Sequence, residues 1–278
     1  MPNPMTALTR DLMHVIGLDQ EPFGIYYSDT KPENAYGPKE GVPISRELEA
    51  THCIDWAAVG KNFSCFIGNI WLARRKHSAA FISAREYGCA GGGFFTGMYA
   101  PYLNRIPYFV STGIPGTPMI GERYMPSPES MHAFMQELDP RPAPAEYCIA
   151  KPLSSFTNGE PPEFVVFFAR PEALTGLYTL VTYTTGNVHA VVSPFGPGCG
   201  NITAWPLYYQ RKGEERAVLG GFDPSARKFM MTDELTLTVP LGLYEKMLEA
   251  APDSVLRTHT WEVVRKKVER SRRAWTSV

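Results

Sequence analysis

The chain lacks a hydrophobic run long enough to span a membrane, which takes about 18 apolar residues in succession. Near its start stand Arg10 and Asp11, where a secretory signal would need an apolar core. Both absences predict a cytoplasmic protein without a membrane partner. Cysteines in that compartment stay reduced, so the five in this chain are expected to serve reactivity or metal binding rather than disulfides.

Charge is also scarce, and neither sign dominates. Charged residues make up 20% of the 278 residues, below the usual quarter, and the formal net charge is −1. Because a nucleic-acid partner calls for a strongly basic surface, none is predicted. The one basic run, from Arg265 to Arg273, lies in a C-terminal segment (253–278) that we expect to form a solvated helix.

Several familiar motifs are missing. The sequence contains no G-x-S-x-G and no H-E-x-x-H, and its glycine-rich stretches do not have the spacing of a nucleotide-binding fingerprint. It also has no C-x-x-C pair, and structural zinc sites normally use such closely spaced pairs. These absences exclude the commonest hydrolase and nucleotide-binding signatures and disfavour structural zinc.

Two glycine-flanked cysteines stand out instead. One lies in Gly88-Cys89-Ala90-Gly91-Gly92, and the other in Gly196-Pro197-Gly198-Cys199-Gly200-Asn201. Each follows an apolar segment that is typical of a strand. A shift of 110 positions aligns the first set with the second: Ala80, Ser83, Gly88 and Cys89 with Ala190, Ser193, Gly198 and Cys199. We therefore expect two equivalent loops near a pseudo-twofold axis, with Cys89 and Cys199 close together.

The wider pattern predicts an α/β (or α+β) fold in a single domain with mixed sheets. The expected halves, residues 20–140 and 160–255, share the order strand, helix, strand, Gly-Cys loop, then strand and helix. Apolar periodicity and helix-start signals set the expected elements. The predicted helices are 6–16, 63–75, 127–138, 171–183 and 240–250, and the predicted strands are 23–27, 79–83, 164–168, 188–192 and 235–239.

Thiolate chemistry is the leading functional hypothesis. Cys65, Cys89 and Cys199, with Cys53 as a weaker fourth, are candidate ligands of a metal centre, most plainly a [4Fe–4S] cluster. Three thiolates would leave one iron to accept a substrate or a water. Cys148 lies in a strand-like run and is expected to be an inert core residue. Backbone N–H groups near the sulfurs are expected from four glycines: Gly91, Gly92, Gly198 and Gly200.

Two alternatives remain open. One is a cysteine-dependent enzyme with Cys199 as nucleophile, a small anionic substrate, and His77 or His189 as base. The other is a non-catalytic module that binds a small molecule. Further candidate ligand-binding residues are Asn201, Asp223 and Arg227, the last as a guanidinium aimed at an anion. The sequence leaves open whether the chain forms a homo-oligomer.

Several segments together resemble a known family. They include Cys65-Phe66-Ile67-Gly68, Ala73-Arg74-Arg75, Gly88-Cys89-Ala90-Gly91-Gly92, Ala150-Lys151-Pro152-Leu153 and Gly220-Gly221-Phe222-Asp223-Pro224-Ser225-Ala226-Arg227. The chain resembles, over about residues 10–255, the family catalogued as domain of unknown function 169, which comprises uncharacterised bacterial and archaeal proteins. The resemblance covers Cys65, Cys89 and Cys199 but not Cys53 or Cys148. It implies no activity, and the family's older description as cysteine-rich is consistent with a cluster.

Overall fold

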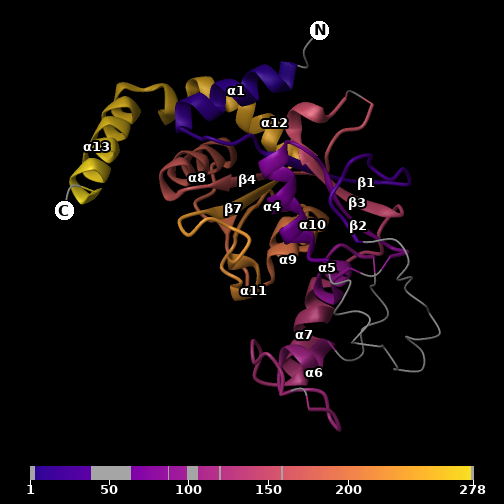
Figure 1. Ribbon diagram of the computed structural model, residues 1–278. Helices are drawn as coiled ribbons and strands as arrows, with labels where there is room; N and C mark the ends of the chain where they lie inside the picture. The colour runs from indigo at the N-terminus through magenta and orange to yellow at the C-terminus, as the bar shows by residue number, and fades with distance from the viewer. Residues whose placement is uncertain are drawn as a thin grey trace.

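The computed structural model describes residues 4–38, 64–86, 88–98, 106–118, 120–157 and 159–276. One seven-stranded sheet forms its centre, in the order β2-β3-β1-β4-β7-β6-β5 (Figure 1). All neighbouring strands are antiparallel except β5 and β6, which are parallel. The predicted α/β class with a mixed sheet is confirmed. The strands are β1 (Phe23–Ser28), β2 (Ala80–Ser83), β3 (Tyr147–Pro152), β4 (Phe164–Ala169), β5 (Val191–Val192), β6 (Ala217–Gly220) and β7 (Leu235–Pro240).

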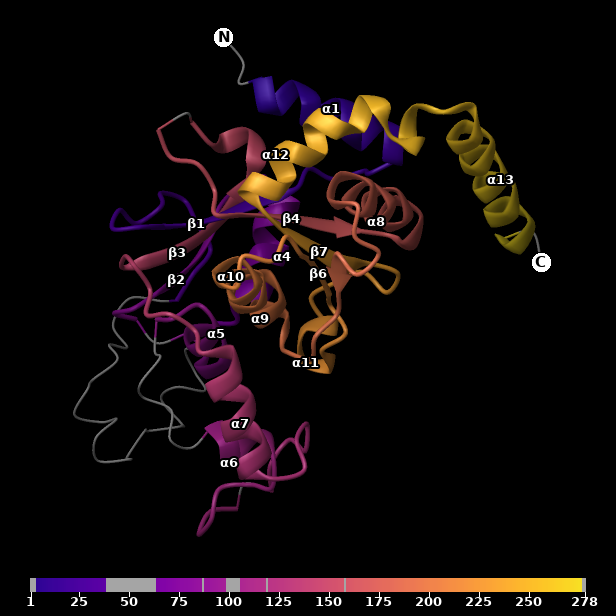
Figure 2. The same cartoon turned by 180° about the vertical axis from the view of Figure 1, so that it is seen from behind.

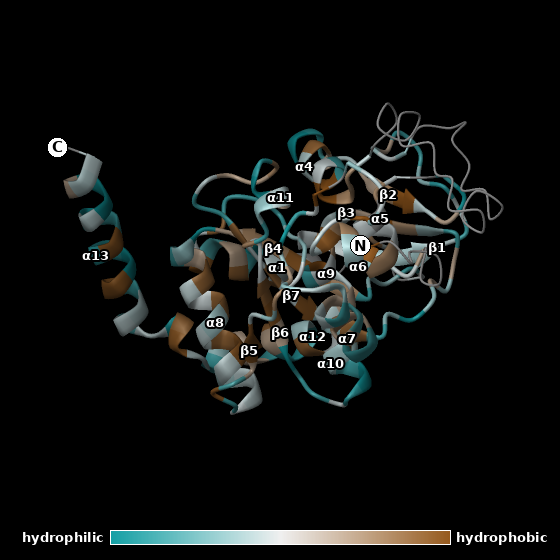
Figure 3. Ribbon diagram, turned by 90° about the horizontal axis from the view of Figure 1, so that it is seen from below, coloured by the Kyte–Doolittle hydropathy of each residue, from teal (hydrophilic) through white to brown (hydrophobic). Residues whose placement is uncertain are grey.

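Helices cover both faces of the sheet (Figure 2). On one face, α1 (Pro4–Ile16), α8 (Pro171–Thr185) and α12 (Leu241–Ala250) pack on a core that includes Val165 and Phe167 of β4. On the other, α4 (Phe66–Lys76), α5 (Ala90–Phe95), α9 (Gly198–Ile202) and α10 (Ala204–Arg211) pack on Phe164 and Val166 of the same strand. Successive side chains of β4 point to opposite faces of the sheet and enter two different apolar cores. The strand is therefore buried and hydrophobic along its whole length (Figure 3).

Helix ends follow the expected sequence signals. The helix α7 (Pro128–Leu138) starts after Ser127, whose hydroxyl oxygen accepts a hydrogen bond from the Ser130 N–H at 3.2 Å. The helix α8 starts at Pro171 and ends before Gly186, which has the left-handed φ of 64° common after helices. Predicted helices at 6–16, 127–138, 171–183 and 240–250 each correspond to an observed helix.

The structure differs from the predicted elements around the second Gly-Cys loop. The strand β5 covers only Val191–Val192, because Asn187 begins a turn. Its side-chain oxygen accepts the N–H of His189 at 2.8 Å, and its carbonyl accepts the N–H of Ala190 at 3.1 Å. Helices α9 and α10 and strand β6 lie where no element was predicted.

The described elements do not confirm the pseudo-twofold duplication. Both halves do run helix, short strand and Gly-Cys helix start, as α4-β2-α5 and α8-β5-α9. Their first strands, β1 and β4, are antiparallel neighbours. A twofold relating such neighbours is perpendicular to the sheet and keeps equivalent helices on the same face. However, α4 and α8 pack on opposite faces, and β6 separates β5 from β7.

Two parts project from this body (Figure 1). Helices α6 (Ile106–Val110) and α7 form an arm on one side, and α13 (His259–Thr276) extends beyond α8 on another. The helix α13 begins later than the predicted 253, after two 3₁₀ turns at Ala251–Asp253 and Val255–Arg257. It is anchored by the Trp261 indole N–H, which donates to the Val15 carbonyl at 2.9 Å. No helix in the described part of the chain is long and apolar enough to cross a membrane.

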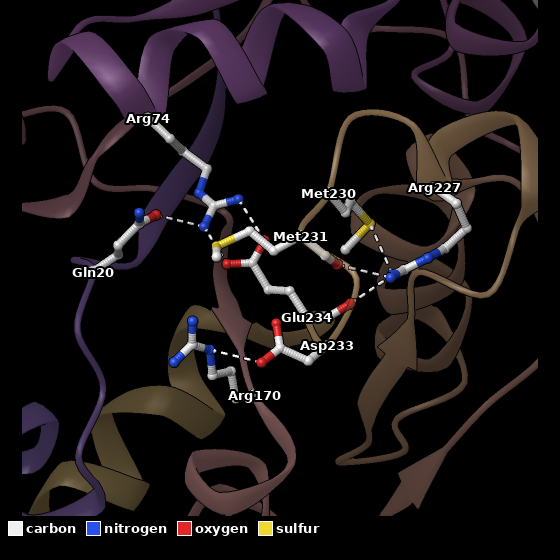
Figure 4. A network of polar contacts seen from close by, with 8 residues as sticks. All are labelled: Gln20, Arg74, Arg170, Arg227, Met230, Met231, Asp233 and Glu234. Carbon is white, nitrogen blue, oxygen red and sulfur yellow. Dashed lines mark hydrogen bonds and ion pairs between the residues drawn. The ribbon is translucent and has the colours of Figure 1, made fainter. Parts of the chain in front are cut away.

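A buried ion pair fixes the loop before β7 (Figure 4). The guanidinium of Arg74, on α4, donates to both carboxylate oxygens of Glu234 at 2.9 and 2.6 Å. The two residues are only 8% and 5% exposed, and the guanidinium lies 4.0 Å from the ring centre of Phe168. Residues 230–234 are therefore held against the helix that begins beside Cys65.

Candidate functional site

Three cysteines stand where helices begin. Cys65 immediately precedes α4, Cys89 immediately precedes α5, and Cys199 is the second residue of α9. The strands before the last two, β2 and β5, lie at opposite edges of the sheet. Strand pairing therefore does not bring Cys89 and Cys199 together. The loops after these strands return over one face of the sheet, where α5 contacts α9.

The three thiols lie close together and are free of disulfides. A carbon added to Gly92 would lie 3.6 Å from Cβ of Cys89 and 3.8 Å from Sγ of Cys199. Burial is the main cause of the raised pKa of Cys89 and of Cys199. Negative charge on Cys65 raises both pKa values further, and negative charge on Cys89 also raises the pKa of Cys199. Such mutual effects require short separations. The structure thus gathers Cys65, Cys89 and Cys199 into one group, called the cysteine cluster below.

Glycines allow this close approach mainly by packing. A Cβ on Gly198 would lie 3.0 Å from a side-chain carbon of Ile67 in α4, and one on Gly200 would lie 2.9 Å from the Phe95 ring in α5. Both glycines therefore let helices meet, which differs from the ligand-binding role predicted for them. Gly91 is different, since a Cβ there would meet no atom of the described residues within 4 Å.

Burial and backbone donors act on the thiols in opposite directions. Burial raises the pKa of all three, for Cys89 to about 11. The N–H groups of Gly91 and Gly92 lower the pKa of Cys89, and those of Ile67 and Gly68 lower that of Cys65. Neither cysteine side chain makes a conventional capping hydrogen bond to the helix that follows it. The cluster therefore holds neutral thiols at neutral pH, beside donors that would stabilise thiolates.

Cys89 is expected to alkylate slowly in the metal-free native protein. With a pKa of about 11, about one thiol in 10,000 is ionised at pH 7, against about one in 100 for an unfolded cysteine with a pKa of about 9. Iodoacetamide labelling followed by mass spectrometry should therefore be at least about 100-fold slower at pH 7 than in urea. The rate should rise about tenfold per pH unit up to pH 10. Equal native and denatured rates would contradict the assignment.

The same shift links Cys89 to stability. Because the folded-state pKa is above the unfolded value, the neutral thiol favours folding at low pH. That contribution is complete below the unfolded pKa of about 9 and is lost as the pH rises through the folded value of about 11.

Asp223, a candidate ligand-binding residue from the sequence, lies beside the cluster. It precedes α11 (Pro224–Arg227), and its carboxylate accepts hydrogen bonds from the Ser225 N–H at 2.9 Å, the Ser225 hydroxyl at 2.7 Å and the Gly198 N–H at 3.3 Å. It is 8% exposed. Its negative charge contributes to the raised pKa of Cys65 and Cys199. Asp223 thus joins α11 to the first turn of α9, directly beside Cys199.

Arg227 and Asn201 have other roles than those predicted. The Arg227 guanidinium donates to four backbone carbonyls, those of Gly221, Met231, Thr232 and Glu234. It therefore braces its own loop, and Figure 4 shows its bonds to Met231 and Glu234. The Asn201 amide donates to the Pro194 carbonyl at 3.2 Å, and its side chain packs under Gly220. Asn201 is 2% exposed and closes the loop before α9.

Replacing Arg227 by alanine should therefore destabilise the protein without altering the cluster. The loss of charge-assisted bonds to four carbonyls in a partly exposed setting predicts about 1–3 kcal/mol of lost stability. Urea unfolding measures that loss, and the Cys89 alkylation rate reports on the site. A stable variant with altered alkylation would restore Arg227 to the site.

The remaining candidates stand apart. Cys148 is 0% exposed within β3, in keeping with a core residue. Cys53 lies outside the described residues. His77 ends α4 at the opposite end from Cys65, and His189 lies in the turn before β5. Among the described residues, the charges that raise the pKa of Cys199 come from Cys65, Cys89 and Asp223.

One acidic residue near the cluster carried no sequence signal. Glu122 lies on the returning segment of the arm, where its N–H donates to the Phe109 carbonyl at 2.8 Å. Gly121 makes that turn with a φ of 78°, and a Cβ there would lie 2.3 Å from the Ser111 carbonyl oxygen. The charge of Glu122 contributes to the raised pKa of Cys89. Only tertiary folding could reveal this proximity, because 33 positions separate Glu122 from Cys89.

The chemistry available is that of three thiols, one buried carboxylate and one exposed carboxylate. Within the described ranges, no three or more His, Cys, Asp or Glu side chains are grouped so as to hold a metal ion. Deprotonated thiols would be soft ligands for iron or zinc. Protonated, as burial favours, they are weak nucleophiles.

Comparison with known proteins identifies the family. The model of domain of unknown function 169, described as uncharacterised ArCR, matches residues 11–250. This covers more than half of the chain, so the chain belongs to that family. No curated protein and no solved structure matches it. The matched region contains the cysteine cluster, Asp223 and Glu122, and ends before α13.

Proposed function

We propose that this member of the family binds a thiolate-ligated metal centre, a [4Fe–4S] cluster held by Cys65, Cys89 and Cys199. The observation that supports it is the convergence of three free thiols from three distant parts of the chain. Cysteine thiolates are the usual ligands of such clusters, and N–H groups directed at the sulfurs tune them. The first turns of α4 and α5 supply N–H groups of that kind.

An iron–sulfur cluster suits this arrangement better than a single ion. A lone zinc draws all its sulfurs to about 2.3 Å from one point. In a cluster each cysteine binds a different iron, so the sulfurs only need to surround a common volume. Iron binding would displace the thiol protons, and the N–H groups would then face charged sulfur. Three protein ligands would leave the fourth iron open to a substrate or a water.

The thiol-enzyme alternative has less support. A catalytic cysteine is normally activated by a lowered pKa. Here burial raises the pKa of all three thiols, and Asp223 adds a negative charge beside Cys199. A metal that replaces the thiol protons would stabilise the thiolates despite their raised pKa. A metal-free catalytic cysteine would have no such help.

Anaerobic reconstitution with iron and sulfide tests the proposal. We expect about four irons and four sulfides per chain, a broad visible absorption band, and loss of both on exposure to air or a chelator. Iron and sulfide assays on protein purified without oxygen measure this directly. A chain that stays free of iron under these conditions, while it remains folded by circular dichroism, contradicts the proposal.

A further inference from the structure

We infer that the chain forms a symmetric homodimer, in which an apolar stripe on α13 of each copy packs into an apolar groove beside α8 of the other copy. The groove lies on the face of the sheet opposite to the cysteine cluster. The inference therefore goes beyond the proposed function, and it does not depend on whether the chain binds iron.

The groove has a volume of about 310 Å³, and none of its nine lining residues is charged. Its walls include Leu174 and Tyr178 of α8, Val191 of β5, Leu219 of β6, and Leu235 and Leu237 of β7. Tyr178 is 46% exposed, so the groove opens to solvent. Ligand pockets are usually enclosed and hold about 300–1,000 Å³. A small and open groove suits side chains inserted from a partner better than a small molecule.

The stripe runs along α13. Its members are Trp261, Val264, Val268 and Trp275, whose spacings of three, four and seven residues place them on one side of the helix. Trp261 is buried, but Val264 is 38% exposed and Trp275 is 82% exposed. The helix extends beyond α8 (Figure 1). Aromatic residues of this kind are enriched in the contact surfaces between proteins.

Contacts within the same chain hold α13 but leave most of the stripe exposed. The Arg265 guanidinium donates to two carbonyls at the end of α1, both at 3.0 Å, and Arg272 pairs with Glu172 of α8 at 2.8 Å. With 3.6 residues per turn, Arg265 and Arg272 fall on the same flank of the stripe as Trp261. The exposed members of the stripe fall on the other flank, so these contacts fix the direction in which they are presented.

The stripe and the groove border the same side of α8. Glu172, which holds Arg272, lies one helical turn before Thr175, and Thr175 lines the groove. A twofold axis that places this side against the same side of a second copy brings each stripe to the groove of the other. Such an interface is isologous, as in most homodimers.

Charge favours contact of α13 with the groove side of a second copy over pairing of two α13 helices. The helix has six Lys or Arg and two Glu, a formal charge of +4, in a chain whose total is −1. The rest of the chain is therefore net negative and attracts α13 of another copy. Two α13 helices side by side would repel each other instead.

Sedimentation of the full chain between about 1 and 100 µM tests the inference, and we expect a species of twice the mass of one chain. Trp275→Ser and Tyr178→Ser should each raise the dissociation constant of this dimer at least about tenfold, because each removes an aromatic contact from both halves of the interface. Ile120→Ser is the matched control, since Ile120 is 78% exposed on the arm, and it should leave the constant unchanged.

A mixture of the two variants identifies which surfaces pair. In a mixed dimer one stripe–groove contact lacks both aromatic residues and the other contact is intact. An equimolar mixture of Trp275→Ser and Tyr178→Ser should therefore dimerise more tightly than either variant alone. If stripe paired with stripe, the mixed dimer would be no tighter than Tyr178→Ser alone. Circular dichroism checks that each variant is folded.

Three results would overturn the inference: a wild-type chain that stays monomeric at about 100 µM, a dimer that Trp275→Ser does not weaken, or a mixture without recovery. Vesicles with anionic lipid test the other surface that a basic amphipathic helix suits. A monomeric chain that binds them through Trp275 would show that α13 docks on a membrane instead of on a second copy.

Discussion

Replacing Cys65, Cys89 or Cys199 by serine, one at a time, is expected to remove most of the iron that the wild-type chain binds after anaerobic reconstitution. A neutral hydroxyl replaces a thiolate poorly as an iron ligand, and a cluster left with two protein ligands is easily lost. We expect each variant to retain less than about a tenth of the wild-type iron. Iron and sulfide assays, with the visible spectrum, measure the change.

Cys148→Ser is the matched control, since it makes the same chemical change elsewhere in the same fold. Its thiol is 0% exposed in β3, so a hydroxyl there should cost about 1–3 kcal/mol of stability and leave the iron content unchanged. Circular dichroism and urea unfolding of all four variants separate loss of ligand from loss of fold. Full iron retention in the three cluster variants would contradict the ligand assignment.

Arg74→Leu is expected to cause the largest loss of stability, about 3–5 kcal/mol. The change leaves the Glu234 carboxylate, only 5% exposed, without its bidentate partner. It also removes the contact of the guanidinium with the Phe168 ring. The midpoint of urea unfolding measures the loss, and a wild-type-like midpoint would show that the pair does not stabilise the fold.

Two further variants sharpen this test. Arg170→Leu breaks the ion pair between Arg170 and Asp233, whose side chains are 37% and 52% exposed respectively. Because this pair is solvated, its loss should lower the stability by no more than about 1 kcal/mol. The double variant Arg74→Leu with Glu234→Leu removes both buried charges and should recover part of the single variant's loss. A double variant as unstable as the sum of the single changes would show that burial of the lone charge is not the cause.

Local patterns in the sequence were sufficient for many elements of the fold. Ser127 and Pro128 mark the start of α7, and the apolar run from Phe164 to Phe168 marks a strand covered on both faces. These features depend on residues within one or two turns of each other. Elements without such signals were missed, notably α9, where the glycines and Cys199 read as a loop.

The candidate site was predictable only in part. Gly-flanked cysteines pointed to Cys89 and Cys199, and their closeness in space followed from an assumed duplication. The structure places them together by another route, because α5 and α9 return over one face from opposite edges of the sheet. The partners of Arg227 could not be predicted from the sequence, since a guanidinium can bond to its own loop carbonyls, as it does here, as readily as to a ligand.

The sequence by itself determined the class of fold, the family and which cysteines are the candidate ligands, because these depend on residue type, spacing and local backbone preference. Tertiary structure alone decided which of those side chains meet and how they are charged. Burial raises the pKa of the thiols, Asp223 is bonded to the residue before Cys199, and Arg227 is bound elsewhere. These properties depend on desolvation and on distances between residues far apart in the chain, and no local pattern encodes either of them.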